Sequence, residues 1–214
     1  TGVKLEIYTT KKDPVKVYTI GGSTQNHLGT FMLMYGSENP FITHIPGFNG
    51  FLSPRYGIQA NEININTWRE TKVFNLEAKD ITKISIIHLQ DSLSSFEVVL
   101  GDASKNPVLL NNNQEVVLYN QKKMSQFINN FNRLNCESFK SDKEDRLKNN
   151  PPLHIILVTH HGKTDTLRTY LLAENLHEKN PEYNFNVERM YATLNNQELM
   201  LIQGYVFNKV LITL

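Results

Sequence analysis

The stretch Leu153–Leu172, LHIILVTHHGKTDTLRTYLL, decides the fold because it places two strands and a turn in one short segment. Its apolar run Leu153–Thr159 and its second half, Thr166–Leu172, have the length and β-branched content of strands, and His160–Lys163 lies between them as a turn. The N-terminal segment Val3–Ile20 has the same strand–turn–strand pattern, with apolar and polar residues alternating at its start. Both ends of the chain are therefore predicted to form antiparallel hairpins.

Further apolar segments extend each hairpin into a meander with short turns. Thr30–Tyr35 and Phe41–Ile45 follow the first hairpin, and Val187–Leu194 and Leu199–Gln203 follow the second. The order and spacing agree between the two ends of the chain, while few residues are identical. Two interpretations remain open: an internal duplication, or the likeness that all antiparallel meanders share.

The clearest helical pattern runs from about Asn120 to Phe139. Apolar residues recur along it at helical spacing and define one stripe: Met124, Phe127, Ile128, Phe131 and Leu134. The predicted fold class is thus α+β, with two related antiparallel β-meander units and one long amphipathic helix between them. We expect units at residues 1–78 and 79–214. The second unit begins with the hairpin Ile81–Leu100 and the helix, which the first unit lacks, so we expect the first unit to be truncated on its N-terminal side.

Several local features complete the predicted layout. Gly21-Gly22 is expected to break the second strand as a bulge or wide turn, and Asn61–Arg69 to form a short helix entered through Asn61. Pro107–Leu110 and Glu115–Leu118 are predicted to be short strands, and Glu174–Asn184 a polar loop.

Composition narrows the function classes. The chain has 214 residues, 40% hydrophobic and 20% charged, which is typical of a globular protein. Its 22 basic and 21 acidic residues give a net charge of +1, without the basic surplus expected of a nucleic-acid binder. Runs such as Leu153–Val158 are too short to span a bilayer. The single cysteine, Cys136, excludes an intramolecular disulfide, and its place beside Leu134 predicts a packed small side chain.

No motif in the sequence predicts a catalytic, cofactor or metal site. Gly162-Lys163 resembles the end of a phosphate-binding loop, but Leu157 stands where that loop requires glycine, so a hairpin turn is the favoured interpretation. His160 and His161 are adjacent and are expected to point to opposite faces, which disfavours a shared metal ion. We therefore predict no catalytic residues, no cofactor and no metal.

The most unusual segment is the aromatic, glycine-punctuated stretch Phe41–Arg55. Exposed aromatic side chains among glycines are suited to binding a partner or ligand. The candidate binding residues are Phe48, Asn49, Phe51 and Arg55 of this segment, together with Trp68. The alternative is that these aromatic rings close the open end of a β core, which is the favoured interpretation because aromatic residues bury readily.

The chain also resembles a known family, the bacterial domain-of-unknown-function family 4340, over nearly its whole length. The resemblance is carried by 18–32 (YTIGGSTQNHLGTFM), 44–55 (HIPGFNGFLSPR) and Trp68-Arg69, and in the second half by Pro151-Pro152, Gly162-Lys163-Thr164, Arg189–Ala192 and Tyr205–Phe207. It implies a domain of the cell envelope, on the periplasmic side of the inner membrane, held by an N-terminal membrane-spanning helix outside this sequence. It also implies partners among membrane transporter or envelope complex components, and it provides no catalytic residues.

Three functions follow as hypotheses. The first is a non-enzymatic protein-interaction or assembly module of a membrane complex, without nucleic acid as a partner. The second is a small-ligand or glycan-binding module that uses a cleft between the two meanders. The third is a hydrolase with a non-standard site, which would require a serine–histidine pair or two acidic residues within hydrogen-bond distance in a concave pocket.

Overall fold

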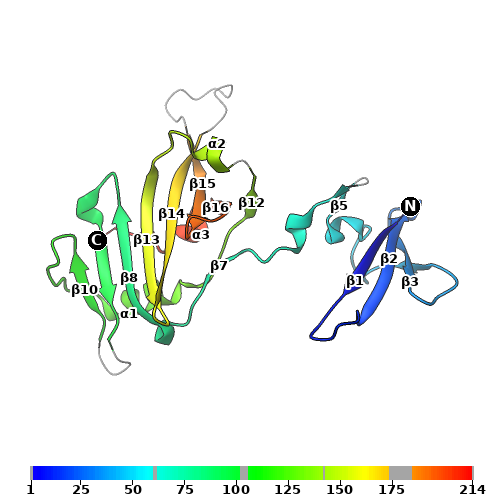
Figure 1. Ribbon diagram of the computed structural model, residues 1–214, viewed down its shortest axis with the longest axis horizontal. Helices are drawn as coiled ribbons and strands as arrows, with labels where there is room; N and C mark the ends of the chain where they lie inside the picture. The colour runs from blue at the N-terminus through cyan, green and yellow to red at the C-terminus, as the bar shows by residue number, and fades with distance from the viewer. Residues whose placement is uncertain (1, 60–61, 102–105, 142, 174–184, 214) are drawn as a thin grey trace. The chain divides into compact units, whose positions relative to one another are not determined.

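The computed structural model describes residues 2–59, 62–101, 106–141, 143–173 and 185–213 (Figure 1). The chain forms two compact units, Thr1–Glu70 and Thr71–Leu214. The sequence placed the division after residue 78, whereas the segment after Glu70 contributes strand β7 to the second unit. The predicted loop Glu174–Asn184 lies outside the described residues.

The first unit is built on a four-stranded antiparallel sheet in which sequence neighbours pair, in the order β1-β2-β3-β4. The predicted break at Gly21-Gly22 is a bulge within a continuous strand, because the register shifts between Ile20 and Ser23. A Cβ on Gly21 would lie 3.0 Å from the carbonyl oxygen of Phe31, so a small residue is needed there. The strands are β1 (Val3–Ile7), β2 (Lys16–Ser23), β3 (Thr30–Met34) and β4 (Phe41–Thr43).

Two short 3-10 helices and a small hairpin follow this sheet. The helix predicted for Asn61–Arg69 is shorter and begins later: its cap is Asn64, whose side-chain oxygen accepts a hydrogen bond from the backbone N–H of Asn66 at 3.1 Å. The η1 segment contacts β2, and Leu52 donates its N–H to the Thr30 hydroxyl at 2.7 Å. The elements are η1 (Ser53–Tyr56), β5 (Ile58–Gln59), β6 (Glu62–Ile63) and η2 (Ile65–Trp68).

The second unit contains an eight-stranded antiparallel sheet in the order β10-β9-β8-β13-β14-β15-β16-β12 (Figure 1). Its centre is the predicted hairpin of β13 and β14, closed by His161 and Gly162 at φ values of 46° and 73°, as a tight two-residue turn requires. The strands are β8 (Ile81–His88), β9 (Phe96–Val99), β10 (Val108–Asn111), β12 (Ser138–Lys140), β13 (Pro152–His160), β14 (Lys163–Ala173), β15 (Phe185–Leu194) and β16 (Leu199–Gln203). The predicted strand Glu115–Leu118 is wrong, because only an isolated bridge joins Val116 to Leu110.

Short elements surround this sheet. Strand β7 pairs with β11 as a separate ribbon, and the last helix, α3, buries Phe207 in the core. The elements are β7 (Lys72–Asn75), η3 (Ala78–Asp80), η4 (Ser92–Ser94), α1 (Gln121–Asn129), β11 (Asn132–Asn135), α2 (Lys143–Leu147) and α3 (Gly204–Phe207). The predicted antiparallel β architecture is confirmed by the strand pairing in both units. The predicted long amphipathic helix is wrong, because among the described residues α1 is the one helix of seven or more residues.

The helix prediction fails at its C-terminal half. Helix α1 begins as expected, with the Asn120 side chain accepting a hydrogen bond from the Lys123 N–H at 3.1 Å. It ends at Asn129, after nine residues, because asparagine is a poor helix former and the chain turns there to pair β11 with β7. Phe131 in the turn and Leu134 on β11 still reach the core, so the apolar periodicity continues although the helix does not.

The core of the second unit lies on one face of the sheet. Helix α1 buries Met124, Phe127 and Ile128 in a cluster that includes Ile156 of β13 and Phe131. Phe131 is completely buried, with ring centroids 5.7 Å from Phe74 and 5.6 Å from Phe127. Cys136 is buried in the same cluster, as its sequence position predicted. A smaller cluster of Tyr170, Tyr191, Leu199 and Leu201 contacts Leu147 of α2.

Candidate binding groove on the first unit

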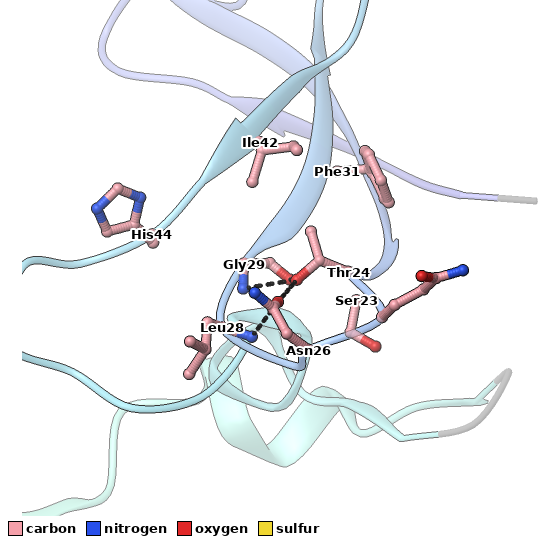
Figure 2. Close-up of a pocket in the computed structure, with 9 residues that line it drawn as sticks. Ser23, Thr24, Asn26, Leu28, Gly29, Phe31, Ile42 and His44 are labelled. Carbon is pink, nitrogen blue, oxygen red and sulfur yellow. Dashed lines mark hydrogen bonds between the residues drawn. The ribbon is translucent and has the colours of Figure 1, made fainter.

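An open hollow of about 850 Å³ lies on the first unit, between strands β3 and β4 and the loop that joins β2 to β3. We call it the β2–β3 groove. It is lined by Ser23, Thr24, Gln25, Asn26, Leu28, Gly29, Phe31, Ile42 and His44. Figure 2 shows Phe31 and Ile42 above the hydrogen-bonded loop, with His44 on the opposite side of Ile42 from Phe31.

Strand register creates the apolar part of the groove. Phe31 of β3 and Ile42 of β4 are direct partners, so their side chains project from the same face of the sheet. They are 42% and 59% exposed, and Leu33, two residues along on the same face, is also exposed. Large apolar side chains that stand together on an exposed sheet face are typical of an interaction surface.

The polar rim of the groove is a loop whose shape is fixed by its own side chains. The Thr24 hydroxyl donates to Asn26 Oδ1 at 2.7 Å, and the backbone N–H of Leu28 donates to the same oxygen at 3.1 Å. The Gly29 N–H donates to Thr24 Oγ1 at 3.0 Å. Because these contacts occupy Asn26 Oδ1, the amide N–H₂ of Asn26 is the group left to donate toward a ligand.

Gly29 allows the loop to lie against β4. A Cβ at this position would be 2.6 Å from Cγ2 of Ile42 and 3.4 Å from Cγ2 of Thr24. A side chain on residue 29 would therefore displace the Ile42 side chain and change the groove wall.

The outer edge of β4 adjoins the groove. In the described sheet β4 pairs with β3 alone, so the backbone groups on its other side have no strand partner there. An open edge next to an apolar groove offers hydrogen bonds and a side-chain pocket together.

The five residues predicted from the sequence do not line this groove and lie in separate contacts. The Arg55 guanidinium stands over the half-buried Phe48 ring at 4.5 Å, and Asn49 is exposed between them in the chain. Phe51 contacts the His27 ring at 5.9 Å, which joins it to the loop of the groove. Trp68 donates its indole N–H to the carbonyl oxygen of Tyr56 at 3.0 Å, and the ring centroids of the two residues are 5.9 Å apart.

Sequence reasoning missed Phe31 and Ile42, although a signal was present. In 30–35, TFMLMY, large apolar residues occupy successive positions, so both faces of β3 are apolar. A strand with one solvated face alternates apolar and polar residues. The departure from alternation indicates a strand whose second face is also meant to be covered.

A serine and a histidine, residue types used in catalysis, lie in contact beside the groove. Ser23 Oγ, at the end of β2, lies 3.1 Å from Nδ1 of His27, in the exposed loop that follows. A nucleophilic serine needs a histidine that a third group orients, together with donors for an oxyanion. His27 instead contacts the Phe51 ring, and no carboxylate contact of its ring occurs among the described residues. The Ser23–His27 contact therefore joins the end of β2 to the loop that follows it.

No described helix combines the length and the apolar character that crossing a membrane requires. No group of three or more histidine, cysteine, aspartate or glutamate side chains in the described ranges is placed to hold a metal ion.

Comparison with known proteins identifies the family of the chain. No curated protein and no solved structure matches the chain. Residues 3–151, which include the groove and extend through α2 of the second unit, match the family model described as Domain of unknown function (DUF4340). This match covers more than half of the sequence, and the chain therefore belongs to the DUF4340 family.

Proposed function

We propose that this chain is a non-enzymatic docking module of a membrane complex in the bacterial cell envelope, and that it binds a short extended segment of a protein partner along β4. The observation that carries the proposal is that Phe31 and Ile42, exposed side by side, lie next to an edge of β4 that has no strand partner in the described sheet. Transporter or envelope complex components are the partners that the family resemblance favours.

The first step of the argument concerns the backbone. An extended segment that adds to a sheet edge satisfies its own N–H and C=O groups and those of the edge strand. The second unit contains such an arrangement: the three-residue strand β12 pairs with the outer edge of β16, with Phe139 opposite Met200. A strand of that length with one apolar side chain is therefore sufficient for this kind of pairing.

The second step concerns the side chains. Residues that pair across strands share a face, so a partner residue placed opposite Ile42 would point to the face that carries Phe31. An apolar side chain there would cover the exposed parts of both residues. The amide of Asn26 and the exposed side chains of Gln25 and His44 would contact its polar neighbours.

We also infer that the two meanders are copies of one unit. Strands β1–β4 and β13–β16 each form an antiparallel series in chain order, which supports a duplication. In the second meander both outer strands have partners, since β8 pairs with β13 and β12 pairs with β16. A partner strand on β4 would correspond to β12.

In vivo photo-crosslinking tests the proposal. A photoreactive amino acid at position 42 of the full-length protein should give a discrete adduct with an envelope protein, and the same residue at position 118 should give none. Leu118 is the matched control because it is 97% exposed and apolar but belongs to the second unit and does not line the groove. Phe31→Lys should abolish the adduct at position 42 while the Trp68 fluorescence of the folded unit is unchanged.

Three results would decide against docking. The first is equal adducts at positions 42 and 118, and the second is a position-42 adduct that survives Phe31→Lys. The third is stabilisation of the purified protein by sugars in a thermal-shift screen, with the shift lost in Asn26→Ala, which would favour the small-ligand or glycan-binding alternative.

A further inference from the structure

The β13–β14 turn brings two adjacent histidines together instead of separating them. The prediction that they point to opposite faces is wrong, because His161 adopts a left-handed conformation at φ 46° and leaves the strand geometry. His160 Nδ1 lies 3.3 Å from His161 Nδ1. The His160 side chain is 5% exposed and that of His161 is 62% exposed, so the pair joins a buried residue to solvent.

Each imidazole faces a carboxylate through its other nitrogen. His160 Nε2 lies 2.7 Å from Asp165 Oδ2, and His161 Nε2 lies 3.3 Å from Asp80 Oδ1, at the end of η3. An ionised carboxylate only accepts hydrogen bonds, so His160 Nε2 carries the hydrogen and His160 Nδ1 is an acceptor, while His161 Nε2 and Asp80 are at ion-pair distance. Asn195 donates to the second oxygen of Asp165 at 2.9 Å, which holds that carboxylate in place.

This arrangement aims the lone pair of His160 Nδ1 at His161 Nδ1. At 3.3 Å the two Nδ1 atoms share a single hydrogen, and a metal ion that replaces this hydrogen can bind both nitrogens. Two nitrogen ligands of one tetrahedral zinc ion, with bonds of about 2.0–2.1 Å, are separated by about 3.3 Å. A metal-bound histidine usually donates its other N–H to a carboxylate, as His160 does here to Asp165, and His161 Nε2 faces the carboxylate of Asp80.

We propose that His160 and His161 form a divalent transition-metal site, with Zn²⁺ bound by the two Nδ1 atoms and Asp165 and Asp80 as positioning residues. The two imidazoles are the only protein ligands that the described residues supply, so water completes the coordination. Imidazole ligands select Zn²⁺, Cu²⁺ and Ni²⁺ over Mg²⁺ and Ca²⁺. The exposed His161 provides the route of entry.

Calorimetric titration of the tag-free, metal-free chain with ZnCl₂ tests the proposal, with Co²⁺ absorption as a second readout of tetrahedral nitrogen coordination. We expect one Zn²⁺ per chain, at least a ten-fold loss of affinity in His161→Ala, and roughly a ten-fold loss in Asp80→Asn, which removes a positioning carboxylate. His44→Ala is the matched control, since His44 is an exposed histidine of the first unit, and it should bind as the unaltered chain does.

The His161 variant changes an exposed side chain, and circular dichroism verifies that it folds. The proposal is overturned if Zn²⁺ does not bind at millimolar concentration, which would mean that only a proton joins the two rings. It is also overturned if His161→Ala binds with unchanged affinity, or if His44→Ala removes the same binding step, since either result would place the ion elsewhere.

Discussion

Replacing Phe131 by alanine should destabilise the second unit and leave the first unit intact. Phe131 is completely buried, and its ring makes edge contacts with Phe74 and Phe127. Truncation of a buried phenylalanine costs about 3–5 kcal/mol, and the upper half of this range applies because the neighbouring rings cannot collapse into the space. This magnitude is a large part of the stability of a domain of this size.

The chain provides separate reporters for the two units. Trp68 is the single tryptophan and lies in the first unit, so its fluorescence follows the unfolding of that unit. Far-UV circular dichroism follows mainly the second unit, which contains the eight-stranded sheet. With a urea dependence of about 2 kcal/mol per molar, Phe131→Ala should lower the midpoint of the dichroism transition by about 2 M. The Trp68 midpoint should not change.

Leu118→Ala serves as the control, because Leu118 is 97% exposed and its truncation should move neither midpoint. A shift below about 0.5 M in Phe131→Ala would mean that the core closes around the missing ring, contrary to the packing argument. Equal shifts of the dichroism and Trp68 transitions would contradict the division into two compact units.

Two further predictions concern backbone strain and pH. Gly57→Ala should lower the free energy of unfolding, measured by Trp68 fluorescence, by at least about 3 kcal/mol, because residue 57 has φ 69° and a Cβ would lie 2.7 Å from a backbone oxygen. Gly36→Ala is the control: residue 36 has φ 84° but lies in open space, so the loss should be only about 1 kcal/mol. Equal losses in the two variants would exclude the clash. Burial, and then the charge of His88, lower the pKa of His154 from 6.5 to about 4, so the unfolded chain binds more protons between these values. The free energy of unfolding should therefore be constant above pH 6.5 and fall toward pH 4, by roughly 1–2 kcal/mol after allowance for partial exposure. Urea titrations at each pH should show that His154→Gln removes this loss. If the pH dependence of the free energy is unchanged in the variant, the loss belongs to other groups.

The strands were predictable from the sequence because their signals are local. The hairpin Leu153–Leu172 was confirmed as β13 and β14 since two apolar runs flank a short turn, and neither run needs information from distant residues. The end of the helix was not predictable in this way. Phe131 and Leu134 continue the helical spacing after Asn129, and the pairing of β11 with the distant β7 decides that they do so in a turn and a strand.

The candidate sites were less predictable because side-chain geometry determines them. The Phe31–Ile42 pair depends on the register of β3 and β4, which sequence spacing alone does not fix. The contact between His160 and His161 depends on a left-handed residue that is not glycine, against the usual preference at such positions. A strand rule applied to these two residues gives opposite faces, and the turn reverses that result.

The contrast between the two meanders explains why the first is the one expected to bind a partner. Both have their strands in the same chain order, but the second has apolar clusters with helices packed against them, through Phe127 of α1 and Leu147 of α2. In the first, Phe31 and Ile42 on one face and Phe41 on the other remain exposed. Exposed apolar area of this kind gains free energy whenever another molecule removes it from water. A meander with apolar residues on both faces, and with unpaired edges in the described sheet, is therefore the one on which we propose that a partner strand docks.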